Sequence, residues 1–85
     1  MKIFYASKFE REYRRLPDGV RKLAERKEAL FRANSFDRRL KTHKLSGKLE
    51  RYWSFSIDQK YRIIFRFIDG GEARFLSVGD HSVYQ

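Results

Sequence analysis

The chain has 85 residues, of which 20 are Lys or Arg, 11 are Asp or Glu and none is Cys, so its formal net charge is +9. This length predicts a single domain, residues 1–85, whose folding buries only about 60% of the unfolded surface. The lack of cysteine excludes disulfides and thiolate chemistry. The sequence shows no signal-peptide pattern and no apolar run of about 20 residues, which excludes a membrane span and predicts a soluble, cytoplasmic protein.

The positive charge is concentrated in the first half of the chain. Residues 1–48 hold 15 Lys and Arg against 6 Asp and Glu, whereas residues 49–85 hold 5 of each kind. Such a surface favours a polyanionic partner, because each neutralised phosphate releases counterions. RNA, DNA and an acidic protein segment would all be suitable partners. Alternatively, the Lys and Arg side chains could do no more than solvate the surfaces of the helices.

The first half of the chain predicts a short strand followed by two helices. Residues 2–5 have strand character, and Ser7 with Glu10 forms an S-x-x-E capping box that predicts the start of a helix. Pro17 ends this helix and, with Asp18, begins a second one. Apolar residues recur at helical spacing in both helices: Phe9, Tyr13 and Leu16 in the first, and Val20, Leu23, Ala24, Leu30 and Phe31 in the second. The two are predicted to form an αα-hairpin.

After a polar, basic connection over residues 34–48, the apolar period changes from helical to alternating. The alternation predicts strands over residues 52–57 and 61–68, separated by a turn at 58–60. Asp69-Gly70-Gly71 predicts a hairpin, because primed turns need positive φ, and a last strand follows over about residues 73–78. The order β-α-α-β-β-β predicts an α+β domain with two helices packed on one face of a twisted, mainly antiparallel four-stranded sheet.

The second half of the chain also holds the groups that could carry chemistry. Arg62 alternates away from the aromatic residues of its strand, so it should project with Arg66 from the sheet face that the helices leave open. Its planar guanidinium can hold two phosphate oxygens. His43 precedes the first long strand and His81 follows the last one, and histidine is the usual general acid or base at neutral pH. Tyr84 could donate a hydrogen bond or stack on a base, and it could equally seal the edge of a small core.

This set of groups suits phosphodiester chemistry, which needs a proton donor, a proton acceptor and fixed positive charge. Other chemistries have little support. Two histidines without cysteine are a poor set of metal ligands, and no glycine-rich phosphate loop or G-x-S-x-G context is present. We therefore expect the chain to use neither a metal nor a cofactor.

Four segments of the chain resemble a known family. The runs THKLSGKL, RYWSFSI, KYRIIFRF and SVGDHSVY, which follow the strand and two helices in this order, resemble the RelE/ParE superfamily of toxins from type II toxin–antitoxin modules. The similarity is to the RelE-type and YafQ-type messenger-RNA endonucleases and covers essentially the whole chain. It implies a microbial, metal-independent endoribonuclease that cuts messenger RNA in the ribosomal A site and is held inactive by a cognate antitoxin.

The resemblance also implies roles for single residues. Arg62 matches the strand arginine that contacts the scissile phosphate, and His81 matches the acid–base position after the G-x-H turn. His43 matches the histidine before the K-L-x-G motif, and Tyr84 resembles the C-terminal aromatic. In the expected reaction the RNA 2′-hydroxyl attacks its adjacent phosphate, the base is His43 or else His81, and His81 protonates the leaving 5′-oxygen. The basic residues expected to bind messenger and ribosomal RNA are Arg14, Arg15, Arg21, Lys22, Arg26, Lys27, Arg38, Arg39, Lys41 and Lys44.

A rival interpretation is a ParE-like toxin, which would share the fold but bind and inhibit DNA gyrase without cutting RNA. ParE-type chains lack the acid–base residues, so the presence of His43, Arg62 and His81 together favours the nuclease. A third possibility is a module that only binds a partner.

Overall fold

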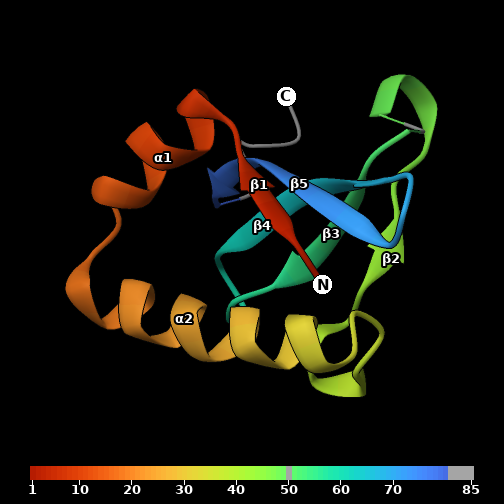
Figure 1. The fold of residues 1–85 in the computed structure, drawn as a ribbon. Coiled ribbons are helices and arrows are strands. Elements are labelled where there is room, and N and C mark those ends of the chain that lie inside the picture. The colour runs from red at the N-terminus through yellow and green to blue at the C-terminus, as the bar shows by residue number, and fades with distance from the viewer. Residues whose placement is uncertain (50, 81–85) are drawn as a thin grey trace.

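Two helices and a five-stranded sheet make up the α+β fold of residues 1–49 and 51–80, the part of the chain that this computed structural model describes. In chain order the elements are β1 (Ile3–Tyr5), α1 (Ser7–Arg14), α2 (Asp18–Ala33), the 3₁₀ turn η1 (Arg38–Leu40), β2 (His43–Lys44), the 3₁₀ turn η2 (Gly47–Leu49), β3 (Trp53–Ser56), β4 (Arg62–Ile68) and β5 (Glu72–Gly79). The strands lie in the order β1-β5-β4-β3-β2 (Figure 1). β1 runs parallel to β5 and the other neighbouring pairs are antiparallel, so the predicted class is confirmed. Within these residues no helix is long and apolar enough to cross a membrane.

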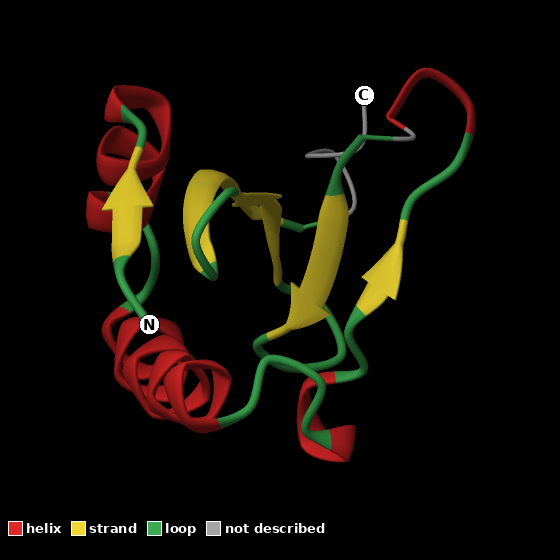
Figure 2. Cartoon of the chain, turned by 45° about the vertical axis from the view of Figure 1, so that its right-hand side comes forward, coloured by secondary structure: helices red, strands yellow, loops and turns green. Residues whose placement is uncertain are grey.

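Aromatic rings fill the space between the helices and the sheet. The Phe31 ring of α2 lies 5.0 Å from that of Phe55, 4.9 Å from Phe65 and 5.4 Å from Phe75, measured between ring centroids. Phe9 of α1 packs on the same face, 5.5 Å from Phe75. Such contacts suit the edge-to-face and offset geometries that aromatic pairs prefer. Both helices therefore lie on one side of the sheet, as predicted and as Figure 2 shows.

The two helices meet near their connection and enclose a hollow beyond it. The Tyr13 hydroxyl of α1 donates over 3.4 Å to the Arg21 carbonyl and to a Glu25 carboxylate oxygen of α2. The hollow has a volume of about 310 Å³ and is lined by Tyr5, Phe9, Glu10, Tyr13, Arg14 and Glu28. The predicted αα-hairpin is thus an open one, and Figure 1 shows the two helices diverging from their connection.

The start of α1 differs from the prediction. The N-cap is Ala6, no side chain caps the helix, and the Glu10 N–H donates to the Ala6 carbonyl at 3.0 Å. The Ala6 N–H itself donates to the Phe75 carbonyl at 2.9 Å, which continues the pairing of β1 with β5. The helix therefore begins directly where the strand leaves the sheet. Ser7 is its first residue, and the predicted capping box of Ser7 and Glu10 is wrong.

Glu12 fastens α1 to the edge of β5. Its Oε1 accepts hydrogen bonds from the Ser77 hydroxyl at 2.7 Å and from the Val78 N–H at 3.1 Å, and its Oε2 accepts one from the Lys8 ammonium at 2.7 Å. Burial raises the pKa of Glu12, but the hydrogen bonds from Lys8, Ser77 and Val78 outweigh it, so the pKa lies below its usual value of 4.5. The ionised carboxylate is therefore the form that stabilises this contact.

We expect Glu12→Ala to lower the free energy of unfolding by about 1–3 kcal/mol near neutral pH, because the Val78 N–H loses its acceptor. Since the folded pKa is lowered, the carboxylate contributes fully above pH 4.5 and loses its contribution as the pH falls through the folded pKa. Urea unfolding of both proteins at about pH 7 and about pH 3 measures this. The difference between them should shrink at the lower pH, with exposed Glu10→Ala as the control; an unchanged difference would show that the charge of Glu12 is irrelevant.

The sheet has five strands, whereas the sequence predicted four. The additional strand, β2, lies in the stretch predicted to be only a connection. It pairs with β3 in the register His43↔Ser54 and Lys44↔Trp53, and the Leu45 N–H donates to the Tyr52 carbonyl at 2.9 Å. Its two polar residues show no apolar alternation, so the neighbouring strand and not the local sequence makes them a strand.

The hairpin of β4 and β5 has the turn that the sequence predicted. Gly70 and Gly71 have φ of 85° and 73°, the left-handed region that this turn requires. A register shift follows further along β4: Ile64 pairs with Ser77 but Phe65 pairs with Phe75, so Leu76 has no direct partner. This bulge is why simple alternation did not fix the register of the last strand.

The sheet face away from the helices is less open than predicted. Ser54 and Ile64 form a cross-strand pair on this face, and they expose only 0% and 4% of their surface. Arg66 is exposed, as predicted, but Arg62 is half-buried. The accessible charged groups of this face therefore lie toward its ends and not at its centre.

Candidate functional site

The Arg62 guanidinium is held by the turn that joins β3 to β4. Nη1 donates to the Asp58 carbonyl at 2.5 Å and to the Tyr61 carbonyl at 3.3 Å, and Nη2 donates to the Gln59 carbonyl at 3.3 Å. The Asp58 carboxylate fixes this turn by accepting from the N–H groups of Lys60 and Tyr61 at 2.8 and 2.7 Å. Neutral carbonyls hold the guanidinium in position, and none of the ion pairs among the described residues includes Arg62.

Arg62 lies in a hollow with cations from other parts of the chain. The hollow has a volume of about 250 Å³ and is lined by Lys27, Arg39, Lys41, Ser56, Ile57, Asp58, Gln59 and Arg62. Lys27 of α2 donates to the Arg39 carbonyl at 3.3 Å, which joins α2 to η1. Arg39 also pairs with Asp37 at 2.9 Å and holds the pKa of that carboxyl down to about 2. Arg39 is thus neutralised by Asp37, and among the described lining residues Lys27, Lys41 and Arg62 remain against the carboxylate of Asp58, a positive balance that favours anions.

His43 adjoins the hollow through Lys41. Lys41 ends η1 with a positive φ of 53°, and its carbonyl lies 3.0 Å from His43 Nδ1. A carbonyl can only accept, so Nδ1 carries the proton in this hydrogen bond. In the neutral imidazole the free lone pair is then on Nε2, and the exposed ring presents it to solvent. In this tautomer Nε2 is the nitrogen that can accept a proton.

The sheet places His43 and Arg62 on the same face, on either side of β3. His43 is opposite Ser54, and Arg62 is opposite Ser56, two residues further along β3. Strand spacing and rise put their Cα atoms about 12 Å apart. The guanidinium leans toward the turn, away from Ser54, and no hydrogen bond joins it to the imidazole. An extended anionic ligand could reach both groups at once.

Two of the predicted catalytic residues, His81 and Tyr84, lie outside the described residues, so their roles stay predictions. Among the residues that are described, no group of three or more His, Asp and Glu side chains is close enough together to hold a metal ion.

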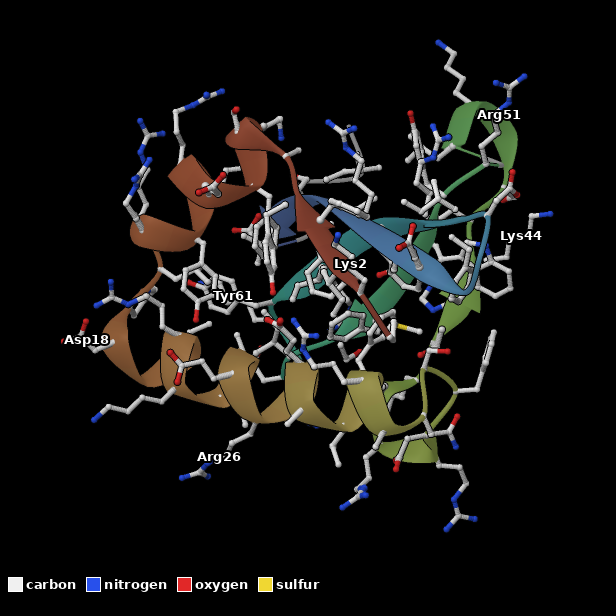
Figure 3. The ribbon with its side chains drawn as sticks, in the orientation of Figure 1. Lys2, Asp18, Arg26, Lys44, Arg51 and Tyr61 are labelled. Carbon is white, nitrogen blue, oxygen red and sulfur yellow. The ribbon has the colours of Figure 1, made fainter. Side chains whose placement is uncertain are left out.

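The ten predicted RNA-binding residues fall into separate areas. Lys27, Arg39 and Lys41 line the Arg62 hollow. Arg14, Arg15, Lys22 and Arg26 are exposed on the two helices and their connection, with Arg26 pointing away from the sheet in Figure 3. Arg21 forms an ion pair with Asp18, Arg38 is exposed on η1, and Lys44 lies on β2 in a different hollow. The sequence predicts a turn at Asp58 but no role in the site. The available signal was its position four residues before Arg62, within reach of that side chain.

No protein-family model and no curated protein sequence matches the chain, but solved structures share its fold. A YoeB/ParE toxin from Agrobacterium tumefaciens superimposes with a TM-score of 0.79 at 19% identity, over 95% of this chain and 99% of that one. YafQ from E. coli BL21(DE3) gives 0.77 at 18% identity, over 98% and 96%. YafQ in the E. coli DinJ–YafQ complex gives 0.73 at 19%, over 96% and 94%. The predicted RelE/YafQ-like toxin fold is therefore confirmed.

Proposed function

We propose that this chain is the toxin of a type II toxin–antitoxin module and an endoribonuclease that cleaves messenger RNA. The observation that carries the proposal is the anion-binding hollow around Arg62, with the Nε2 lone pair of His43 on the same sheet face. The shared toxin fold supports it.

In the proposed reaction the RNA supplies its own nucleophile. His43 Nε2 takes the proton of the 2′-hydroxyl as the 2′-oxygen attacks the adjacent phosphorus, although His81 remains the alternative base. Arg62 stabilises the charge that develops on the phosphate oxygens. The bond from phosphorus to the 5′-oxygen then breaks, and His81 protonates that oxygen. Tyr84 orients a nucleobase of the RNA. The products are a 2′,3′-cyclic phosphate and a 5′-hydroxyl.

The exposed cations of the helices are proposed to bind ribosomal RNA. Lys22 and Arg26 lie on the side of α2 that faces solvent, opposite the Phe31 contacts with the sheet. Each phosphate contact adds affinity that depends on salt but not on sequence. The nuclease would thus act on messenger RNA in the ribosome.

A cognate antitoxin is proposed as the protein partner that holds the chain inactive. A solved structure with this fold is a complex of YafQ with DinJ. The net charge of +9 favours an antitoxin with an acidic segment, which could cover the Arg62 hollow.

The test is to incubate the purified chain with a defined messenger RNA, with and without ribosomes, and to determine the chemistry of the new ends. We expect cleavage in the presence of ribosomes that persists in EDTA and leaves 2′,3′-cyclic phosphate and 5′-hydroxyl ends. Ends that carry a 5′-phosphate would contradict attack by the 2′-hydroxyl. Intact RNA together with inhibition of DNA gyrase supercoiling would favour the ParE-like alternative instead.

A further inference from the structure

A second hollow lies at a step in the sheet. Its volume is about 450 Å³, and it is lined by Lys44, Arg51, Trp53, Arg66 and Phe67. β4 pairs with β3 as far as Phe65, which lies opposite Trp53. The remainder of β4, up to Ile68, pairs with β5 but not with β3. The hollow occupies the place that a longer β3 would fill. Figure 3 shows Lys44 and Arg51 at the same end of the molecule.

One wall of this hollow is part of a partly exposed aromatic cluster. The Trp53 ring lies 5.3 Å from that of Phe67 and 5.5 Å from that of Phe36, and the Phe36 and Phe67 rings are 5.8 Å apart. Phe36 is 55% exposed, although a ring of this size gains more from burial than most side chains. The cluster therefore offers an apolar, planar surface to a ligand while its inner side stays fixed by the core.

The remaining lining residues are positive. No carboxylate among the described residues lines the hollow, and their ion pairs do not include Lys44, Arg51 or Arg66. Arg66 also lies directly opposite Arg74 on β5, and both side chains are exposed. Like charges in this cross-strand position destabilise a sheet. A bound anion would relieve the repulsion between Arg66 and Arg74, so this pair destabilises the sheet least when an anionic ligand is present.

We propose that the hollow of Lys44, Arg51, Trp53, Arg66 and Phe67 binds one nucleotide of a single-stranded RNA, with its base stacked on the aromatic cluster and its phosphate held by the cations. The inference rests on the proposed function and extends it, because it adds a subsite for a nucleotide that flanks the cleaved position. Stacking on aromatic rings combined with cationic contacts to the backbone is how proteins bind unpaired nucleic acid.

The position of the hollow fits this role. His43 and Lys44 are consecutive residues of β2, and β2 is the outermost strand of the sheet on that side. Ser56, which pairs with Arg62, and Trp53 are about 10 Å apart along β3, and their side chains point to opposite faces of the sheet. A single strand of a few nucleotides can pass around this short edge and reach both hollows. An acidic peptide would satisfy the cations but would not need a planar aromatic surface.

Trp53 is the only tryptophan of the chain, so its fluorescence reports on this hollow directly. The experiment is a titration of the full chain with short 2′-O-methyl RNA oligonucleotides, which lack the free hydroxyl needed for cleavage. We expect saturable quenching, and we expect oligonucleotides with abasic sites to bind about 5- to 150-fold more weakly, since stacking contributes about 1–3 kcal/mol per base. Arg66→Gln should lower the salt dependence of log K by about 0.7, the effect of one lost phosphate contact.

Arg11→Gln, an exposed change on α1, is the matched control and should leave quenching unaltered. Binding without quenching, or equal binding of abasic oligonucleotides, would overturn the stacking site. Stronger quenching by an oligoglutamate peptide that contains phenylalanine would assign the hollow to a protein partner instead. Because these oligonucleotides cannot be cleaved, quenching without any cleavage of natural messenger RNA would reject the nuclease and leave the nucleotide site standing.

Discussion

His43→Gln is expected to lower the rate of RNA cleavage by about 10²- to 10⁴-fold, because the variant has no group at this position that can accept the proton of the 2′-hydroxyl. The structure gives this residue the correct tautomer: the Lys41 carbonyl holds Nδ1–H and leaves the Nε2 lone pair free. Single-turnover cleavage of ribosome-bound messenger RNA over a range of pH measures the effect. The variant should also lose the limb of the pH–rate profile that a titrating base produces.

The fold should survive this change, since the His43 side chain is exposed and its single described hydrogen bond is to a neighbouring backbone group. Thermal melting of His43→Gln is the check. A wild-type rate in a folded His43→Gln protein would remove His43 from the mechanism and make His81 the base. The same measurement on His81→Ala would then show the loss of the acid–base limb.

Arg62→Ala is expected to lower the cleavage rate by about 10²- to 10³-fold, the usual cost of removing a donor that stabilises charge in the transition state. The guanidinium is held by the carbonyls of Asp58, Gln59 and Tyr61, so it must exchange some of these hydrogen bonds for bonds to the phosphate oxygens when a phosphate beside His43 arrives. Arg62→Lys should recover only part of the rate, because an ammonium cannot hold two phosphate oxygens in the fork geometry. Single-turnover cleavage rates of the wild type, Arg62→Lys and Arg62→Ala should decrease in this order.

Arg11→Ala is the matched control for Arg62→Ala, since it removes one exposed cation of α1 that lines neither basic hollow. It should cleave at nearly the wild-type rate, with any loss confined to a weaker association with the ribosome. If Arg62→Ala is folded and cleaves no more slowly than Arg11→Ala, the guanidinium does not act on the phosphate. The hollow would then serve only to bind the backbone, through Lys27, Arg39 and Lys41.

The elements that the sequence predicted well are those whose signal is local. The stripe containing Phe31 fixed the buried side of the second helix, because an apolar residue every three or four positions leaves one face to bury. Gly70 and Gly71 fixed the hairpin, because few other residues adopt positive φ there without strain. The alternation around Arg62 correctly separated it from the aromatic face, since strand side chains alternate between faces.

The predictions that failed or were incomplete depended on partners that are distant in the chain. The strand of His43 and Lys44 exists because β3 pairs with it. The start of α1 follows from the hydrogen bond that the Ala6 N–H donates to the Phe75 carbonyl. Neither signal is visible within a window of a few residues. The burial of Ile64 on the far face likewise depends on the packing of several strands.

The sequence by itself determined the class of fold, the buried faces of the helices and the residue types available for phosphate chemistry, because periodicity and composition act locally. Only the tertiary structure decided that Lys27 of α2, Lys41 before β2 and Arg62 of β4 share one hollow. It also decided that the Arg62 guanidinium rests on turn carbonyls fixed by Asp58. These contacts join elements separated by many residues, and their geometry follows from how the strands and α2 pack, which no local pattern encodes.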